Sequence, residues 1–196
     1  IRDMQWFEDA QKWASADKYF HWKLQFPEVY YQTDGQTTES PGFDAVIGNP
    51  PYVRQELITS LKDYLQKQFS VYHGRADIYG YFVEKALNLV GDECRLSYIL
   101  SHKFTKVKSG KGLRELIGDH QIEEFIDFQD LPVFGSDVSA YPAIMILSKT
   151  PAREPFKYAE IDNLDFNSLP DRVDQIKKLV DQSYLSDDEW TFLGQA

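Results

Sequence analysis

The chain has 196 residues, a length that suits one globular domain with room for part of a second. Its formal net charge of −10 argues against a general nucleic-acid-binding surface, because phosphate contacts require clustered lysine and arginine. The single cysteine, Cys94, excludes an intrachain disulfide and a cysteine metal cluster, and no apolar run approaches the roughly 18 residues of a membrane span. We therefore expect a cytoplasmic protein without membrane contacts, and no metal site.

The first quarter of the sequence predicts a helix, an aromatic segment, a loop and a strand. Residues 3–14 have helical spacing, and residues 20–31 are rich in aromatic side chains and read as an extended segment. Residues 33–41 are polar and predict an exposed loop. The apolar run of residues 43–49 predicts a buried strand of the kind found in parallel sheets.

The rest of the sequence alternates between helical and strand patterns. Asp77 suits the start of a helix that ends at Gly91. This alternation predicts an α/β fold in which helices pack on a sheet. The predicted helices are residues 57–69, 78–90, 113–117 and 172–180, and the predicted strands are residues 95–100, 122–128, 143–147 and 156–161.

The tetrapeptide Asn49-Pro50-Pro51-Tyr52 follows the predicted strand and is the strongest functional signal. The Asn49 side chain and the Pro50 carbonyl offer two acceptors for the N–H groups of a planar amino group. Consecutive prolines restrict the backbone and so preorganise these acceptors, while Tyr52 can stack on the planar ring. The alternative is a simple turn after a strand.

A basic cluster interrupts the acidic sequence between residues 103 and 114. We expect its lysines to contact phosphates, with Gly110 and Gly112 providing flexibility, and the alternative is a loop that is merely solvated. The cluster consists of Lys103, Lys106, Lys108, Lys111 and Arg114.

Residues 20–149 resemble the adenine-specific DNA methyltransferases of restriction–modification systems, above all the fused type IIG enzymes with the gamma order of motifs. Residues 43–52 match their catalytic motif, residues 75–86 resemble the helix that follows it, and residues 133–147 resemble a later motif. The resemblance implies part of a Rossmann-like methyltransferase sheet, S-adenosylmethionine as methyl donor and double-stranded DNA as partner. It also implies that Asn49 and Pro50 hold the amino group of a flipped adenine, with Tyr52 and Phe134 stacking on its ring.

The donor-binding glycine motif of that family is expected upstream of residue 43, where Gly35 and Gly42 do not fit it. We therefore predict a fragment that, when isolated, is inactive and binds the donor weakly. The expected organisation is an N-terminal segment (1–42), the catalytic half of the methyltransferase domain (43–150), and a linker leading toward target recognition (151–196).

Other functions remain open from sequence alone. Protein glutamine methyltransferases share the Asn-Pro-Pro-Tyr motif, and a non-catalytic module of a restriction complex would need no donor site. An endonuclease role for this segment is weaker, because Asp171, Asp174 and Lys177 lack the usual spacing of a nuclease motif and suit a solvated helix face. A nuclease domain is instead possible elsewhere in the same protein.

Overall fold

The computed structural model describes residues 12, 20–53, 59–135, 141–185 and 189–192. Contacts divide the chain into two units, Ile1–Pro41 and Gly42–Ala196. The helix predicted for residues 3–14 lies outside the described residues except for Lys12. None of the helices in the described ranges has the length and apolar character needed to cross a membrane.

The first unit contains two short helices, α2 (Trp22–Gln25) and α3 (Pro27–Tyr30), so the predicted extended segment is wrong. Pro27 opens α3 at a position where its missing N–H costs nothing. The rings of Trp22 and Phe26 stack with centroids 6.0 Å apart, which explains how a run rich in aromatic residues favours helical turns here. The polar loop that follows is largely exposed, as predicted.

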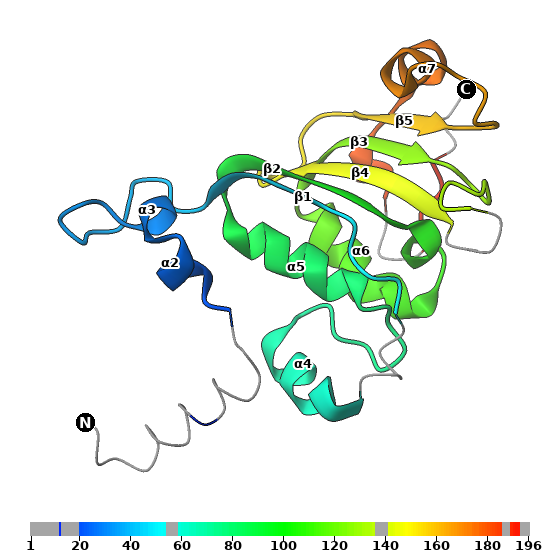
Figure 1. Ribbon diagram of the computed structural model, residues 1–196. Coiled ribbons are helices and arrows are strands. Elements are labelled where there is room, and N and C mark those ends of the chain that lie inside the picture. The colour runs from blue at the N-terminus through cyan, green and yellow to red at the C-terminus, as the bar shows by residue number, and fades with distance from the viewer. Residues whose placement is uncertain (1–11, 13–19, 54–58, 136–140, 186–188, 193–196) are drawn as a thin grey trace. The chain divides into compact units, whose positions relative to one another are not determined.

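In the second unit, six strands of the described chain form one sheet in the order β1-β2-β4-β3-β5-β6 (Figure 1). β2 pairs in parallel with β1 and β3 pairs in parallel with β5, whereas β4 lies antiparallel between β2 and β3. The carboxyl ends of β1, β2, β3 and β5 therefore meet at one edge of the sheet, where open α/β sheets bind ligands. The strands are β1 (Phe43–Gly48), β2 (Val90–Ser101), β3 (Gln121–Asp127), β4 (Pro142–Ser148), β5 (Phe156–Glu160) and β6 (Lys178–Val180).

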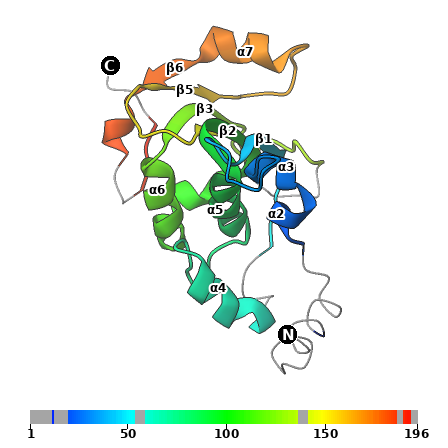
Figure 2. The ribbon, with the colours of Figure 1, turned by 90° about the vertical axis from the view of Figure 1, so that its left-hand side faces the viewer.

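Helices cover both faces of this sheet, with α5 and α6 on one face and α7 on the other (Figures 1 and 2). The pleat of β3 sends Phe125 into the core beneath α5 and α6, and its neighbour Ile126 into a second core against Val173 of α7. The alternation of side-chain direction along β3 therefore contributes to two hydrophobic layers. The helices of this unit are α4 (Lys62–Gln68), α5 (Tyr79–Leu89), α6 (Lys111–Gly118) and α7 (Leu169–Ile176).

The α/β architecture and the predicted inner strands are confirmed, but three boundaries differ. The strand β2 begins at Val90, so Gly91 lies within a strand and the helix before it has already ended. The predicted helix 172–180 ends at Ile176, and its last residues form β6 beside β5. The predicted helix 57–69 is confirmed only for α4 and the short 3-10 turn before it.

The expectation that β1 is buried is wrong. Ile47 is 81% exposed. β1 is an edge strand, which among the described residues pairs only with β2. An apolar pattern typical of a central parallel strand thus occurs here in an edge strand.

Residues after 150 continue the same sheet through β5 and β6. The short stretch 189–192 returns to the main core, where Trp190 and Phe192 are buried. Assignment of residues 151–196 to a linker and target recognition stays a prediction.

Candidate active site

The segment of residues 49–53, called the motif loop below, leaves the carboxyl end of β1. Asn49 is exposed and Pro50 is buried, so the loop presents an amide while its backbone stays anchored. A side chain at Gly48 would place its Cβ 3.0 Å from the ring of Tyr98 on β2. Glycine before Asn49 therefore lets the loop start close against the neighbouring strand.

Tyr52 is fixed from two directions. Its hydroxyl donates a hydrogen bond to the carbonyl oxygen of Ile99 on β2 at 3.2 Å, and partial burial raises its pKa to about 12. Tyr52 is thus a neutral donor at any physiological pH. Next to it, the carbonyl of Val53 accepts from the backbone N–H of Ile78 at 2.8 Å, which joins the motif loop to the start of α5.

Phe134 lies beside Tyr52, with ring centroids 5.8 Å apart and an interplanar angle of 50°. Phe134 is 36% exposed, so the pair is accessible from one side. Two aromatic residues from segments far apart in the sequence, both predicted to stack on a target base, therefore meet. The contact fits aromatic pairing in a tilted arrangement.

At the carboxyl ends of the parallel strands, the exposed amide of the motif loop lies in the same part of the chain as the ring of Tyr52, which pairs with Phe134. An amide carbonyl and a backbone carbonyl can accept the two N–H bonds of a planar amino group, whose ring then rests against Tyr52. The arrangement suits recognition of an aromatic ring with an exocyclic amino group.

The residues of the basic cluster, called the basic segment below (103–114), are used in different ways. Arg114 is buried, and its Nη1 donates to the carbonyl oxygens of Phe104 at 2.5 Å and Val107 at 2.8 Å. Lys106 donates from Nζ to the carbonyl oxygen of Trp190 at 2.6 Å. Both cations therefore stabilise the protein's own fold.

The side chains of the other lysines of the basic segment do not contact backbone carbonyls in the contacts described. Lys103 places its Nζ 4.6 Å from the ring centroid of Tyr141, and Lys111 forms an ion pair with Glu115 at 3.5 Å. Lys108 is exposed. Phosphate contact by Lys103, Lys106, Lys108 and Lys111 stays a prediction.

Gly110 and Gly112 do not provide the flexibility that was expected of them. A Cβ at Gly110 would lie 2.2 Å from the carbonyl oxygen of Phe104, and one at Gly112 would lie 3.2 Å from Cα of Val71. Both glycines permit close backbone packing, and Gly110 opens α6.

The described glycines upstream of β1 do not form a donor cradle. Gly42, with φ of 138°, lets the backbone approach Gly91, because a Cβ there would lie 2.4 Å from the Gly91 nitrogen. Gly35, with φ of 83°, lies in the exposed loop. The residues described here therefore do not fit a complete S-adenosylmethionine site.

The residues weighed for a nuclease lie on α7. Asp174 forms an ion pair with Lys177 that lowers the pKa of its carboxyl, and Asp171 lies in the first turn, capped by Ser168. The described part of the chain contains no group of three or more His, Cys, Asp or Glu side chains placed to hold a metal ion. Asp174 and Lys177 thus form an ion pair at the surface, Asp174 on α7 and Lys177 directly after it.

Sequence reasoning missed two residues at the same edge of the sheet. His102 follows β2 and Asp127 ends β3, and the His102 Nδ1 lies 2.6 Å from the Asp127 Oδ1. Neither belongs to a recognisable motif. The only signal was their position after predicted strands.

Comparison with known proteins gives a family match and relatives. The model of the family "Eco57I restriction-modification methylase" matches residues 2–134. The Type II methyltransferase M.BstVI of Geobacillus stearothermophilus is 40% identical over 129 residues, which cover 64% of this chain and 22% of that protein. The chain thus spans about a fifth of the length of the curated relatives it matches.

Solved structures share the fold. The type IIG restriction endonuclease BpuSI has a TM-score of 0.55 at 16% identity, over 72% of this chain and 19% of that one. A protein of Listeria monocytogenes assigned to the class I S-adenosylmethionine-dependent methyltransferases has a TM-score of 0.54 at 14% identity, over 71% of this chain and 43% of that one. The predicted Rossmann-like methyltransferase fold is confirmed.

Proposed function

The chain belongs to the Eco57I restriction-modification methylase family, and from this premise we propose that the protein containing it methylates the 6-amino group of adenine in double-stranded DNA. The observation that carries the proposal is the motif loop, with exposed Asn49 beside the paired rings of Tyr52 and Phe134. The family match supports methyl transfer to DNA, and the motif loop supports an exocyclic amino group as acceptor.

In this proposal Asn49 and Pro50 change the geometry of the target nitrogen. The lone pair of an aromatic amino group is delocalised into the ring and is a poor nucleophile. When the Asn49 side chain and the Pro50 carbonyl accept its two N–H bonds, the nitrogen shifts toward a tetrahedral form and its lone pair becomes available. With the donor bound, this nitrogen would take the methyl group as the sulfur–methyl bond breaks, the donor would leave as its thioether, and the nitrogen would then lose one proton to water.

The target base must leave the duplex, because its amino group is shielded within the base stack. Stacking on Tyr52 offsets part of the cost of unstacking, at roughly 1–3 kcal/mol for a base on an aromatic side chain. A base held between two rings needs about 3.5 Å on each face, or about 7 Å in all. Since the Tyr52 and Phe134 centroids lie 5.8 Å apart, the rings separate when a base enters between them.

The proposed methyl donor is S-adenosylmethionine, which supplies an activated methyl group. Support comes from the shared fold with the Listeria methyltransferase. The residues described here act on the acceptor side: they hold the amino group, orient the ring and exclude water from its face. A nuclease elsewhere in the same protein is part of the proposal, because one structural neighbour is a restriction endonuclease.

The test is methyl transfer by the full-length protein, with tritium-labelled S-adenosylmethionine and both DNA and cellular protein as acceptors. The digested DNA is expected to carry the label in N6-methyladenine. Label in cytosine would contradict the choice of adenine, and label in protein glutamine would support the protein methyltransferase alternative. Absence of label in every acceptor would favour the non-catalytic module.

A further inference from the structure

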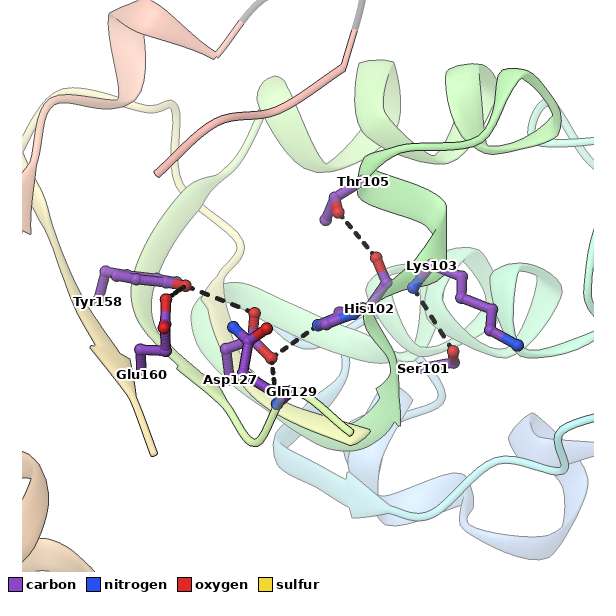
Figure 3. A network of polar contacts seen from close by, with 8 residues as sticks. All are labelled: Ser101, His102, Lys103, Thr105, Asp127, Gln129, Tyr158 and Glu160. Atoms are coloured by element: carbon purple, nitrogen blue, oxygen red, sulfur yellow. Dashed lines mark hydrogen bonds and ion pairs between the residues drawn. The ribbon is translucent and has the colours of Figure 1, made fainter. Parts of the chain in front are cut away.

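Asp127 lies at the centre of a network that joins the ends of three strands (Figure 3). It is the last residue of β3 and is buried, yet its carboxylate contacts groups on three other segments. The Oδ1 atom lies 2.6 Å from the His102 Nδ1 and accepts from the backbone N–H of Gln129 at 2.8 Å. The hydroxyl of Tyr158 on β5 lies 3.4 Å from Oδ2.

The contact with Gln129 controls the direction of residues 128–135, called the stacking loop below. Gln129 has φ of 54°, a left-handed backbone conformation that residues other than glycine rarely adopt. The Asp127 carboxylate stabilises this turn by accepting its N–H. From there backbone bonds lead onward, from Leu131 to Phe128 and from Gly135 to Pro132, so the turn sets the position of Phe134.

The contact with His102 reaches the basic segment. His102 directly follows β2, its backbone N–H donates to the carbonyl of Tyr141 at 2.9 Å, and the two rings lie 5.7 Å apart. Lys103 comes next and lies over the same Tyr141 ring. Asp127 therefore connects the stacking loop to the start of the basic segment through a single carboxylate.

We propose that Asp127, through His102 and the Gln129 turn, is a positioning residue that keeps the loop carrying Phe134 beside Tyr52, so that a flipped base can enter between the two rings and stack. This inference rests on the proposed methyltransferase function. Asp127 does not contact the Tyr52–Phe134 pair itself, and it acts by fixing the backbone that carries Phe134.

The surroundings of this network make the inference testable by truncation. His102 and Asp127 line a pocket of about 310 Å³. Shortening either side chain therefore enlarges an existing space, so the variants are expected to fold. The space left by His102→Ala can also admit free imidazole, which presents the same ring nitrogen to Asp127.

The experiment uses the full-length protein and a DNA duplex with 2-aminopurine at the target position, whose fluorescence rises when the base leaves the stack. Asp127→Ala and His102→Ala are expected to lower the flipped-base signal at saturating protein, and kcat, by at least about fivefold. Binding to a duplex that lacks the target base is expected to stay within twofold, because no stacking is needed there. Imidazole is expected to restore part of the flipped-base signal of His102→Ala and to leave the signal of Asp127→Ala unchanged.

Two further variants serve as controls. Asp127→Asn keeps an oxygen that can accept from both Gln129 and His102, and is expected to retain most of the flipped-base signal. Glu160→Gln changes a carboxylate that touches Tyr158 at 3.2 Å and, among the contacts described, neither His102 nor the stacking loop, so it is expected to behave as the wild type.

The outcomes separate this inference from the proposed function. A wild-type protein that transfers no methyl group to DNA would contradict the proposed function itself. A wild type that methylates DNA, together with Asp127→Ala that keeps the full flipped-base signal, would overturn the positioning role alone. Equal loss of binding to the duplex without a target base would also overturn it, because the defect would then be general misfolding.

Discussion

The motif loop and the basic segment leave the neighbouring strands β1 and β2 at the same edge of the sheet, but they use their polar groups differently. The motif loop anchors itself with Pro50 and leaves the Asn49 amide exposed. The basic segment buries Arg114 and directs its guanidinium to backbone carbonyls, while Lys106 binds the carbonyl of Trp190. One segment leaves its amide side chain open to solvent, and the other uses two of its cations to hold its own backbone.

The difference shows that a local cluster of charge does not define a nucleic-acid surface. Backbone carbonyls at a tightly folded segment need donors, and a nearby cation can satisfy them in place of a phosphate. The acidic total charge of the chain is consistent with this internal use of cations. Variants that separate ligand contact from internal support can therefore test the comparison directly.

The largest expected effect is on catalysis at the motif loop. Asn49→Ala in the full-length protein removes one of two acceptors for the amino group, and kcat is expected to fall by roughly 10²–10³-fold. Single-turnover methylation at saturating DNA measures the loss. Asn88→Ala, which removes an exposed amide on α5, serves as the matched control and should leave kcat unchanged. Equal kcat values for Asn49→Ala and the control would show that the motif loop is only a turn.

A large effect on stability is expected from the basic segment. Arg114→Ala leaves the Phe104 carbonyl without its charged donor, and hydrogen bonds of this kind contribute about 1.5–3 kcal/mol each. The free energy of unfolding in urea, followed by circular dichroism, is expected to fall by about 3 kcal/mol. Lys111→Ala, which loses only an exposed ion pair with Glu115, should cost about 0.5 kcal/mol or less. A similarly small cost for Arg114→Ala would contradict the structural role given to Arg114.

The contrast also explains which features could be predicted from the sequence. The motif loop was predictable because two consecutive prolines restrict the backbone locally, whatever surrounds them. The partners of Lys106 and Arg114 were not, because Trp190 is far away in the chain and the Phe104 carbonyl is oriented by a fold that local patterns do not encode.

The same limit applies to the sheet. Apolar periodicity identified β2, β3 and β4, whose burial comes from pairing within this chain. It gave the wrong environment for β1, whose apolar residues are typical of a central strand although β1 is an edge strand with Ile47 exposed. The link between His102 and Asp127 was missed because neither residue lies in a motif, and only the parallel arrangement of β2 and β3 brings them together.

A smaller effect is expected at the aromatic pair. Tyr52→Ala removes the stacking surface and is expected to cost roughly 1–3 kcal/mol of transition-state stabilisation, measured as the change in kcat/KM for DNA. Tyr52→Phe keeps the ring and loses only the hydrogen bond to the Ile99 carbonyl, so its cost should be about 1 kcal/mol or less. Equal losses in both variants would mean that Tyr52 acts by supporting β2, which would make the motif loop resemble the basic segment.

The smallest expected effect distinguishes the lysines of the basic segment from one another. Each phosphate contact by a lysine contributes about 1 to the slope of log affinity for DNA against log salt concentration. Lys108 is exposed, so Lys108→Ala is expected to reduce that slope by about 1 in the full-length protein. Lys106→Ala is expected to leave the slope unchanged and to lower stability, because the ammonium group is held by the Trp190 carbonyl. An unchanged slope for Lys108→Ala would mean that this lysine is merely solvated, whereas a reduced slope for Lys106→Ala would mean that DNA displaces residues 189–192 from this cation and that its internal use is not permanent.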